Sequence, residues 1–159
     1  MKRIGLLVID VQMGFKDASW GRRNVGEEFE RRIADLLATW RLHHQPVFHV
    51  NHDSSSPEGR FRPGTPGNAP MPEARPLAGE PIFRKRVNSA FIGTGLEGTL
   101  RDQQIATVVV IGLTTSHCVS TTVRMSGNLG FDTYVVSDGT ATFDRIGLDG
   151  GGRSRSRAE

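Results

Sequence analysis

The chain has 159 residues, a net charge of +3 and a single cysteine. This length suits one domain with a central sheet and flanking helices. No apolar stretch approaches the ~20 residues of a membrane span, and one cysteine excludes an internal disulfide. The first residues lead into an apolar run without a signal-peptide pattern, so together with the lone thiol they predict a cytoplasmic protein.

Most of the positive charge lies at the carboxyl end. Arg153, Arg155 and Arg157 outweigh Glu159 there, which leaves a net charge of only +1 for residues 1–152. No basic patch interleaved with aromatic residues remains. We therefore expect a small-molecule substrate as the partner, and neither nucleic acid nor membrane.

The first half of the chain predicts two strands, one helix and a long loop. Residues 3–10 predict a buried strand and residues 27–42 an amphipathic helix. Residues 46–51 predict the second strand. Residues 53–80 are rich in Pro, Gly and Ser and lack periodicity, and an irregular loop of this length is unusual unless it covers a site.

The second half continues the alternation of strands and helices. Lys85 lies on or just after a short extended segment. A helix, a strand, a second helix and a final strand follow at residues 96–103, 107–112, 118–129 and 133–137. This order predicts an α/β fold in three layers, with a mostly parallel central sheet and helices on both faces. Right-handed crossovers then place the ends of the first and fourth strands on one rim.

Cys118 follows the fourth predicted strand and begins a helix. Unpaired N–H groups and the positive end of the helix dipole at such a position favour a thiolate and a neighbouring oxyanion. A buried structural thiol is the alternative.

Two charged residues accompany this thiol. Asp10 ends the first strand, and a carboxylate there points into the crevice where open α/β sheets bind ligands, although a helix cap or turn is the alternative. Lys85 shares its strand face with Phe83 and Val87, which favours an inward direction over a solvated edge charge.

These residues lie in segments that together resemble the isochorismatase-like cysteine hydrolases, a group that includes nicotinamidases and N-carbamoylsarcosine amidases. The segments are Asp10-Val11-Gln12, Lys85 followed by Ser89-Ala90-Phe91, and the run from Gly112 to Thr122 around Cys118. The resemblance extends in order from residue 4 to about residue 145. It implies the three-layer isochorismatase-like fold and a catalytic triad of Asp10, Lys85 and Cys118.

The resemblance implies a hydrolase that cleaves a C–N bond of a small amide or carbamoyl compound. The residue types suit that chemistry. Asp10 can accept the thiol proton and return it to a leaving amine, while Lys85 would hold the carboxylate and stabilise negative charge. Cys118 would then attack the carbonyl carbon, and water would hydrolyse the resulting acyl-thioester.

Further site features are implied by the resemblance alone. Backbone N–H groups of Thr114 and Cys118 would form the oxyanion hole, beside a cis peptide bond between Leu113 and Thr114. Phe15 and Trp20 would help to wall the substrate pocket, for which ordinary packing under a loop is the alternative.

No metal and no other cofactor is predicted. Some nicotinamidases hold a metal on an Asp-x-His pair and a later His, whereas residues 49–53 lack that order and no histidine lies between His52 and His117. This departure also weighs against nicotinamide as the substrate. Adjacent residues on a starting helix point about 100° apart, so His117 should lie at the site rim or a subunit contact rather than form a dyad with Cys118.

The carboxyl-terminal end departs from the family pattern. Family members continue with a helix and a final strand, whereas residues 147–159 are rich in Gly, Arg and Ser. We expect a hydrolase domain over residues 1–146 and a disordered tail after it. The missing elements would expose sheet edge and core.

A truncated, catalytically silent homologue that acts as a binding or oligomerisation module is therefore the alternative function. Family members usually associate, so a homo-oligomer is expected. Phosphoryl transfer is disfavoured, because the segment after Asp10 lacks a second acidic residue for Mg²⁺ and no phosphate-binding Gly loop follows the first strand.

Overall fold

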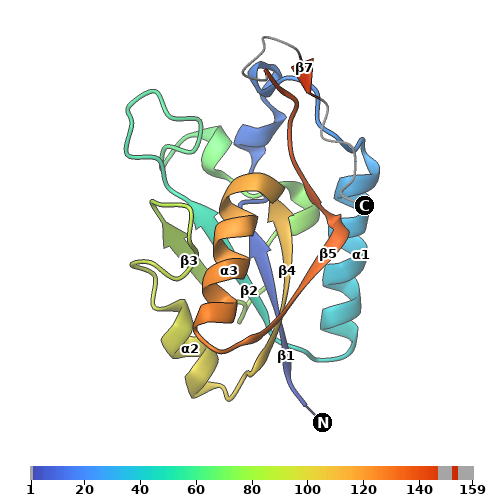
Figure 1. Cartoon of the computed structure of the whole chain (residues 1–159), viewed down its shortest axis with the longest axis vertical. Helices are drawn as coiled ribbons and strands as arrows, with labels where there is room; N and C mark the ends of the chain where they lie inside the picture. Colours follow the sequence, from blue (N-terminus) through green and yellow to red (C-terminus); the bar gives the residue numbers. More distant parts are fainter. Residues whose placement is uncertain (1, 147–151, 154–159) are drawn as a thin grey trace.

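The computed structural model describes residues 2–146 and 152–153. A five-stranded sheet in the order β3-β2-β1-β4-β5 forms its centre (Figure 1). All four strand pairings within this sheet are parallel. The strands are β1 (Ile4–Ile9), β2 (Val47–His52), β3 (Ile82–Lys85), β4 (Thr107–Leu113) and β5 (Asp132–Ala141). The predicted α/β class with a mostly parallel sheet is confirmed.

The central strand β1 is apolar on both faces because both faces are covered. Leu6 and Val8 belong to one hydrophobic cluster, and Leu7 and Ile9 belong to another on the opposite side of the sheet. Side chains of a strand point alternately to its two faces, so the unbroken apolar run of β1 fills both cores at once.

Within the described residues, three α-helices form the outer layers (Figure 1). The helix α1 (Glu28–Leu42) packs Phe29, Ile33 and Leu37, spaced four residues apart, into the first cluster. The helices α2 (Leu96–Asp102) and α3 (Ser120–Asn128) lie over the other face, where the second cluster forms. Because the two clusters cover both faces of the sheet, packing holds the middle strands in place, and the residues at their ends can take up defined positions.

Two elements differ from the boundaries that the sequence predicts. The strand β5 runs to Ala141, because its pairing with β4 shifts register between Val110 and Gly112 and then resumes. The helix after β4 begins with a π-helical turn over Thr115–Val119 before α3 starts at Ser120. Neither the irregular pairing nor the wide turn has a signature in the apolar pattern.

The long segment between β2 and β3 contains two short 3-10 turns, Pro66–Asn68 and Pro72–Ala74. The buried Asn68 amide donates to the Phe61 carbonyl at 2.8 Å and to Asp53 Oδ1 at 2.9 Å. This buried amide ties the segment to the end of β2, so an irregular stretch is held in a defined position.

The carboxyl end of the described chain forms a small two-stranded sheet. The strand β6 (Arg145–Ile146) pairs antiparallel with β7 (Gly152–Arg153). The remainder of the predicted tail, residues 147–151 and 154–159, lies outside the described residues. Within the described ranges, none of the helices combines the length and apolar character needed to cross a membrane.

Candidate active site

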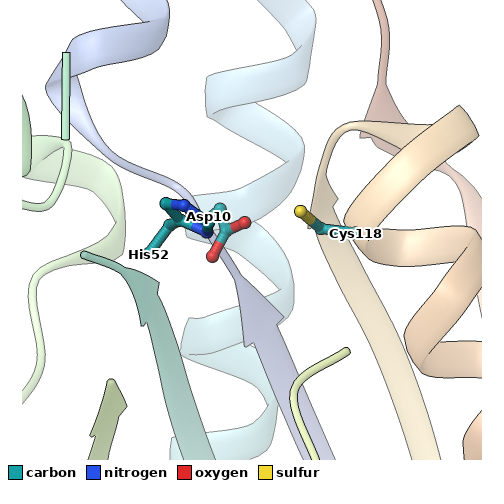
Figure 2. Close-up of side chains that lie close together, drawn as sticks. All are labelled: Asp10, His52 and Cys118. Atoms are coloured by element: carbon teal, nitrogen blue, oxygen red, sulfur yellow. The ribbon is translucent and has the colours of Figure 1, made fainter. Parts of the chain in front are cut away.

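Three strand ends meet at one edge of the sheet and bring the predicted triad together. Asp10 directly follows β1, Lys85 is the last residue of β3, and Cys118 lies in the π-helical turn after β4. Figure 2 shows the sulfur of Cys118 turned toward the Asp10 carboxylate. The carboxyl edge of a parallel sheet is where open α/β folds place ligands, and the site lies there.

The Lys85 ammonium is the centre of this cluster. Its Nζ lies 2.8 Å from Asp10 Oδ2 and 3.2 Å from Cys118 Sγ. It also donates to the Val87 carbonyl at 3.1 Å and lies 3.1 Å from His52 Nδ1. The residue is only 1% exposed, so the cation and its carboxylate partner form a buried ion pair.

Asp10 is held in an uncommon backbone conformation, with φ at +51°. Aspartate is among the few residues that tolerate this left-handed region. Burial raises the pKa of Asp10, and the positive charge of Lys85 opposes that rise. Its Oδ1 is buried without a hydrogen-bond partner within the described part of the chain. One carboxylate oxygen is thus paired with lysine, while the other is left to accept a proton.

Cys118 is mostly buried and rests as a thiol. Burial raises its pKa to about 12, the charge of Asp10 adds to the rise, and Lys85 opposes it. The expectation that the helix start favours a thiolate therefore differs from what the structure indicates, because burial beside a carboxylate outweighs the donors. A thiol and a nearby carboxylate form the resting pair.

His52 completes the cluster, and sequence reasoning gave it no role beyond the metal question. Burial and the charge of Lys85 lower the pKa of His52 to about 4, so its imidazole is neutral at ordinary pH. The Nδ1 atom therefore accepts from the Lys85 ammonium, and the ring hydrogen lies on Nε2. Its signal in the sequence is positional, since it ends the strand next to β1.

A cavity of about 430 Å³ opens over Asp10 and Cys118. Its aromatic residues, the predicted Phe15 and Trp20 together with Phe61 and Phe143, pack against one another. The ring centroids of Phe15 lie 5.0 Å from Trp20 and 4.7 Å from Phe61. Phe61 and Phe143 come from distant segments and were missed, because single aromatic residues in irregular stretches carry no periodic signal.

His117 is one of the residues that line the cavity. Its Nδ1 lies 3.1 Å from Thr114 Oγ1 and its Nε2 lies 2.8 Å from Arg145 Nη2. The peptide bond between Leu113 and Thr114 is cis.

Asp10, His52 and Cys118 also offer three potential metal ligands within 4.8 Å of one another. Lys85 Nζ, however, lies within 3.2 Å of one such atom from each residue. A buried ammonium therefore already occupies the point on which the three groups converge, and a metal ion would have to displace it. These residues do not fit a resident metal.

Comparisons with known proteins show the family of the chain. The model of the isochorismatase domain matches residues 5–147. The isochorismatase family protein YrdC of Bacillus subtilis is 49% identical over 87% of this chain and 73% of its own length. A hydrolase structure of that family from Chromobacterium violaceum has a TM-score of 0.90 at 46% identity and covers 96% of this chain and 78% of that chain.

Two further relatives are amidases. The nicotinamidase/pyrazinamidase of Mycobacterium tuberculosis is 31% identical over 86% of this chain and 85% of its own length. The N-carbamoylsarcosine amidase structure from Thermoplasma acidophilum has a TM-score of 0.77 at 28% identity, covering 92% of this chain and 87% of that chain. The parallel sheet with its candidate site at the strand ends is an open α/β fold. The chain belongs to the isochorismatase family and is an isochorismatase-like hydrolase.

Proposed function

We propose that this hydrolase cleaves the C–N bond of a small amide or carbamoyl compound through an acyl-thioester on Cys118. The observation that carries the proposal is the Lys85 ammonium, placed 2.8 Å from Asp10 and 3.2 Å from the Cys118 sulfur. One buried cation thus contacts both the base and the nucleophile. When a proton moves between Asp10 and Cys118, the negative charge moves the other way, and the Lys85 cation offsets that charge on either group.

The first half of the reaction forms the thioester. The thiol proton passes from Cys118 to Asp10 while the sulfur attacks the carbonyl carbon, and the carbonyl electron pair moves to oxygen. When that pair returns, the C–N bond breaks and Asp10 gives its proton to the departing nitrogen. The raised pKa of Asp10 suits this task, because it makes the carboxylate a better proton acceptor than an exposed aspartate.

The second half releases the acid. Asp10 takes a proton from water, the oxygen attacks the thioester carbon, and the C–S bond breaks so that Cys118 regains its proton. Backbone N–H groups of Thr114 and Cys118 are the proposed donors to the oxyanion in both halves. A donor of this kind contributes on the order of 3 kcal/mol to transition-state stabilisation.

The aromatic wall favours a compact acyl group with a flat or apolar face. Four aromatic residues of the lining pack against one another, while Asp10 and Cys118 are joined by further polar lining residues that include Asn88, His117 and Arg145. Ligand sites of this composition orient a small molecule with few polar contacts. The amidases among the relatives support an amide or carbamoyl group as the reacting centre.

Ammonia release from a panel of small amides tests the proposal. The panel contains nicotinamide, pyrazinamide and N-carbamoylsarcosine, and the proteins are the wild type, Cys118→Ala and Asp10→Asn. We expect both variants to lose at least about 10³-fold in rate while their circular dichroism stays unchanged. Asp102→Asn, an exposed carboxylate at the end of α2, is the matched control and should retain full activity. Activity retained by Cys118→Ala would refute the nucleophile.

A further inference from the structure

Lys85 has more acceptors around it than protons to donate. An ammonium carries three N–H donors. Four acceptor groups surround Nζ within 3.2 Å: Asp10 Oδ2, Val87 O, His52 Nδ1 and Cys118 Sγ. One of these contacts must therefore go without a proton at any moment.

Two of the four groups are the stronger acceptors for the N–H donors of Lys85. Asp10 is a buried carboxylate at the shortest distance, 2.8 Å, and the Val87 carbonyl is an amide oxygen, which accepts more strongly than a neutral thiol. His52 at 3.1 Å and Cys118 at 3.2 Å then compete for a hydrogen bond from the third N–H of Lys85. A neutral imidazole nitrogen is a better acceptor than a thiol, whereas a thiolate is better than either.

His52 is fixed in place for this contact. Its backbone N–H donates to Gln12 Oε1 at 2.8 Å, and its carbonyl accepts from Gln12 Nε2 at 3.0 Å. The Phe61 ring packs edge-on against the imidazole with centroids 5.9 Å apart. The charged groups that act on this ring are Lys85 and Asp53, with Asp10 beside Lys85. A buried glutamine thus sets the position of a histidine that points at the lysine.

We propose that His52 is a positioning residue. In the resting enzyme its Nδ1 accepts a hydrogen bond from the third N–H of Lys85, and this N–H turns to the sulfur when the Cys118 thiol ionises. The role rests on the proposed function, since it concerns the ionisation of the same nucleophile. It predicts that His52 stabilises the thiol form relative to the thiolate. Removing the imidazole acceptor should then make Cys118 ionise more readily.

Alkylation of Cys118 by iodoacetamide, followed by intact mass between pH 7 and pH 9.5, tests this role. Cys118 is the only cysteine, so every added mass reports this site. His52→Leu removes the acceptor, whereas His52→Asn keeps an amide oxygen near the place of Nδ1. We expect alkylation of His52→Leu to be about three- to tenfold faster than wild type at each pH, the effect of one hydrogen bond on the pKa. His52→Asn should stay within about twofold.

The shape of the pH profile separates positioning from simple loosening. In the proposed case the rate of His52→Leu still rises about tenfold per pH unit through pH 9.5, because the thiol pKa stays high. A plateau above about pH 9, typical of a solvated thiol, would mean that the variant has opened the site and would overturn the role. Equal rates for His52→Leu and wild type, or equal acceleration in both variants, would overturn it as well. The assay needs no substrate, so absence of ammonia release counts against the proposed function alone.

Discussion

At the scale of the residue, the site depends on an ion pair kept away from water. Asp10 and Lys85 are each about 1% exposed, and isolated burial of either charge would be costly. Each compensates the other, and Lys85 gains further contacts with Val87, His52 and Cys118. Removing one member therefore does more harm than removing both.

Lys85→Met tests this compensation. The variant leaves the Asp10 carboxylate buried without its cation, and we expect a loss of roughly 3 kcal/mol in the free energy of unfolding at neutral pH. Adding Asp10→Asn should recover part of that loss, because the double variant buries no charge. Urea unfolding of the wild type and the three variants measures both effects. A double variant less stable than Lys85→Met would contradict the view that the pair is held by mutual compensation.

The sequence predicts the place of a site residue in the fold when that residue lies at the end of a predicted strand or helix. Asp10, Lys85 and Cys118 follow predicted elements, so their convergence could be predicted. His52 also ends a strand, but its contact with Lys85 depends on the spacing of β2 and β3 and on the Gln12 clamp. The raised pKa of Cys118 depends on burial, which no local pattern reports.

At the scale of the element, the close approach of β1 and β4 places the Asp10 carboxylate near the Cys118 thiol. Gly112 lies beside Ile9 in the parallel register, just before the turn that carries Cys118. Its φ is +124°, and a Cβ added there would lie 2.0 Å from the Ile9 carbonyl oxygen. Only glycine allows the two strand ends to meet as they do.

Gly112→Ala should therefore destabilise the protein by at least about 2 kcal/mol, through the left-handed backbone and the collision with β1. Thermal unfolding measures the loss, and any folded fraction should release ammonia more slowly because Asp10 and Cys118 are pushed apart. Gly127→Ala is the matched control. It lies inside α3 with open space around its Cβ, so alanine should be neutral or stabilising by up to about 1 kcal/mol. Equal effects of the two substitutions would contradict the close-approach argument.

The sequence predicted the main elements well because apolar runs and helical spacing determine them. The strand β1 and the helix α1 agree with residues 3–10 and 27–42 to within one or two residues. The extension of β5 to Ala141 could not be predicted, since it depends on a register shift against β4. The local sequence pattern predicts which residues form a strand, but not the register in which that strand pairs with its neighbour.

At the scale of the whole molecule, a second polar cluster joins layers away from the site. Glu80 lies 2.7 Å from Arg41 Nε at the end of α1 and 2.7 Å from His49 Nε2 in β2. It also accepts from the Leu77 N–H at 3.0 Å. Although its burial acts in the opposite direction, these contacts hold the pKa of Glu80 at about 2, well below its ordinary 4.5.

The stabilisation from Glu80 should consequently be lost in acid. The folded-state pKa lies below that of the unfolded chain, so the contribution is complete above about pH 4.5 and fades as the pH falls toward 2. Glu80→Gln should lower the urea midpoint at pH 6 and reduce its decline between pH 6 and pH 3. Glu97→Gln, which breaks an exposed pair with Arg101, should leave the free energy of unfolding within about 0.5 kcal/mol of wild type. If the urea midpoint of Glu80→Gln fell between pH 6 and pH 3 as much as that of the wild type, this contribution of Glu80 would be excluded.

The acyl-thioester on Cys118 is the central claim, and acid-quenched intact mass during turnover of an amide tests it most directly. We predict a transient mass increase equal to the acyl group, located on the peptide that contains Cys118, lost on treatment with hydroxylamine and absent from Cys118→Ala. Release of ammonia without any adduct, together with activity in Cys118→Ala, would contradict the assignment of Cys118 as the nucleophile.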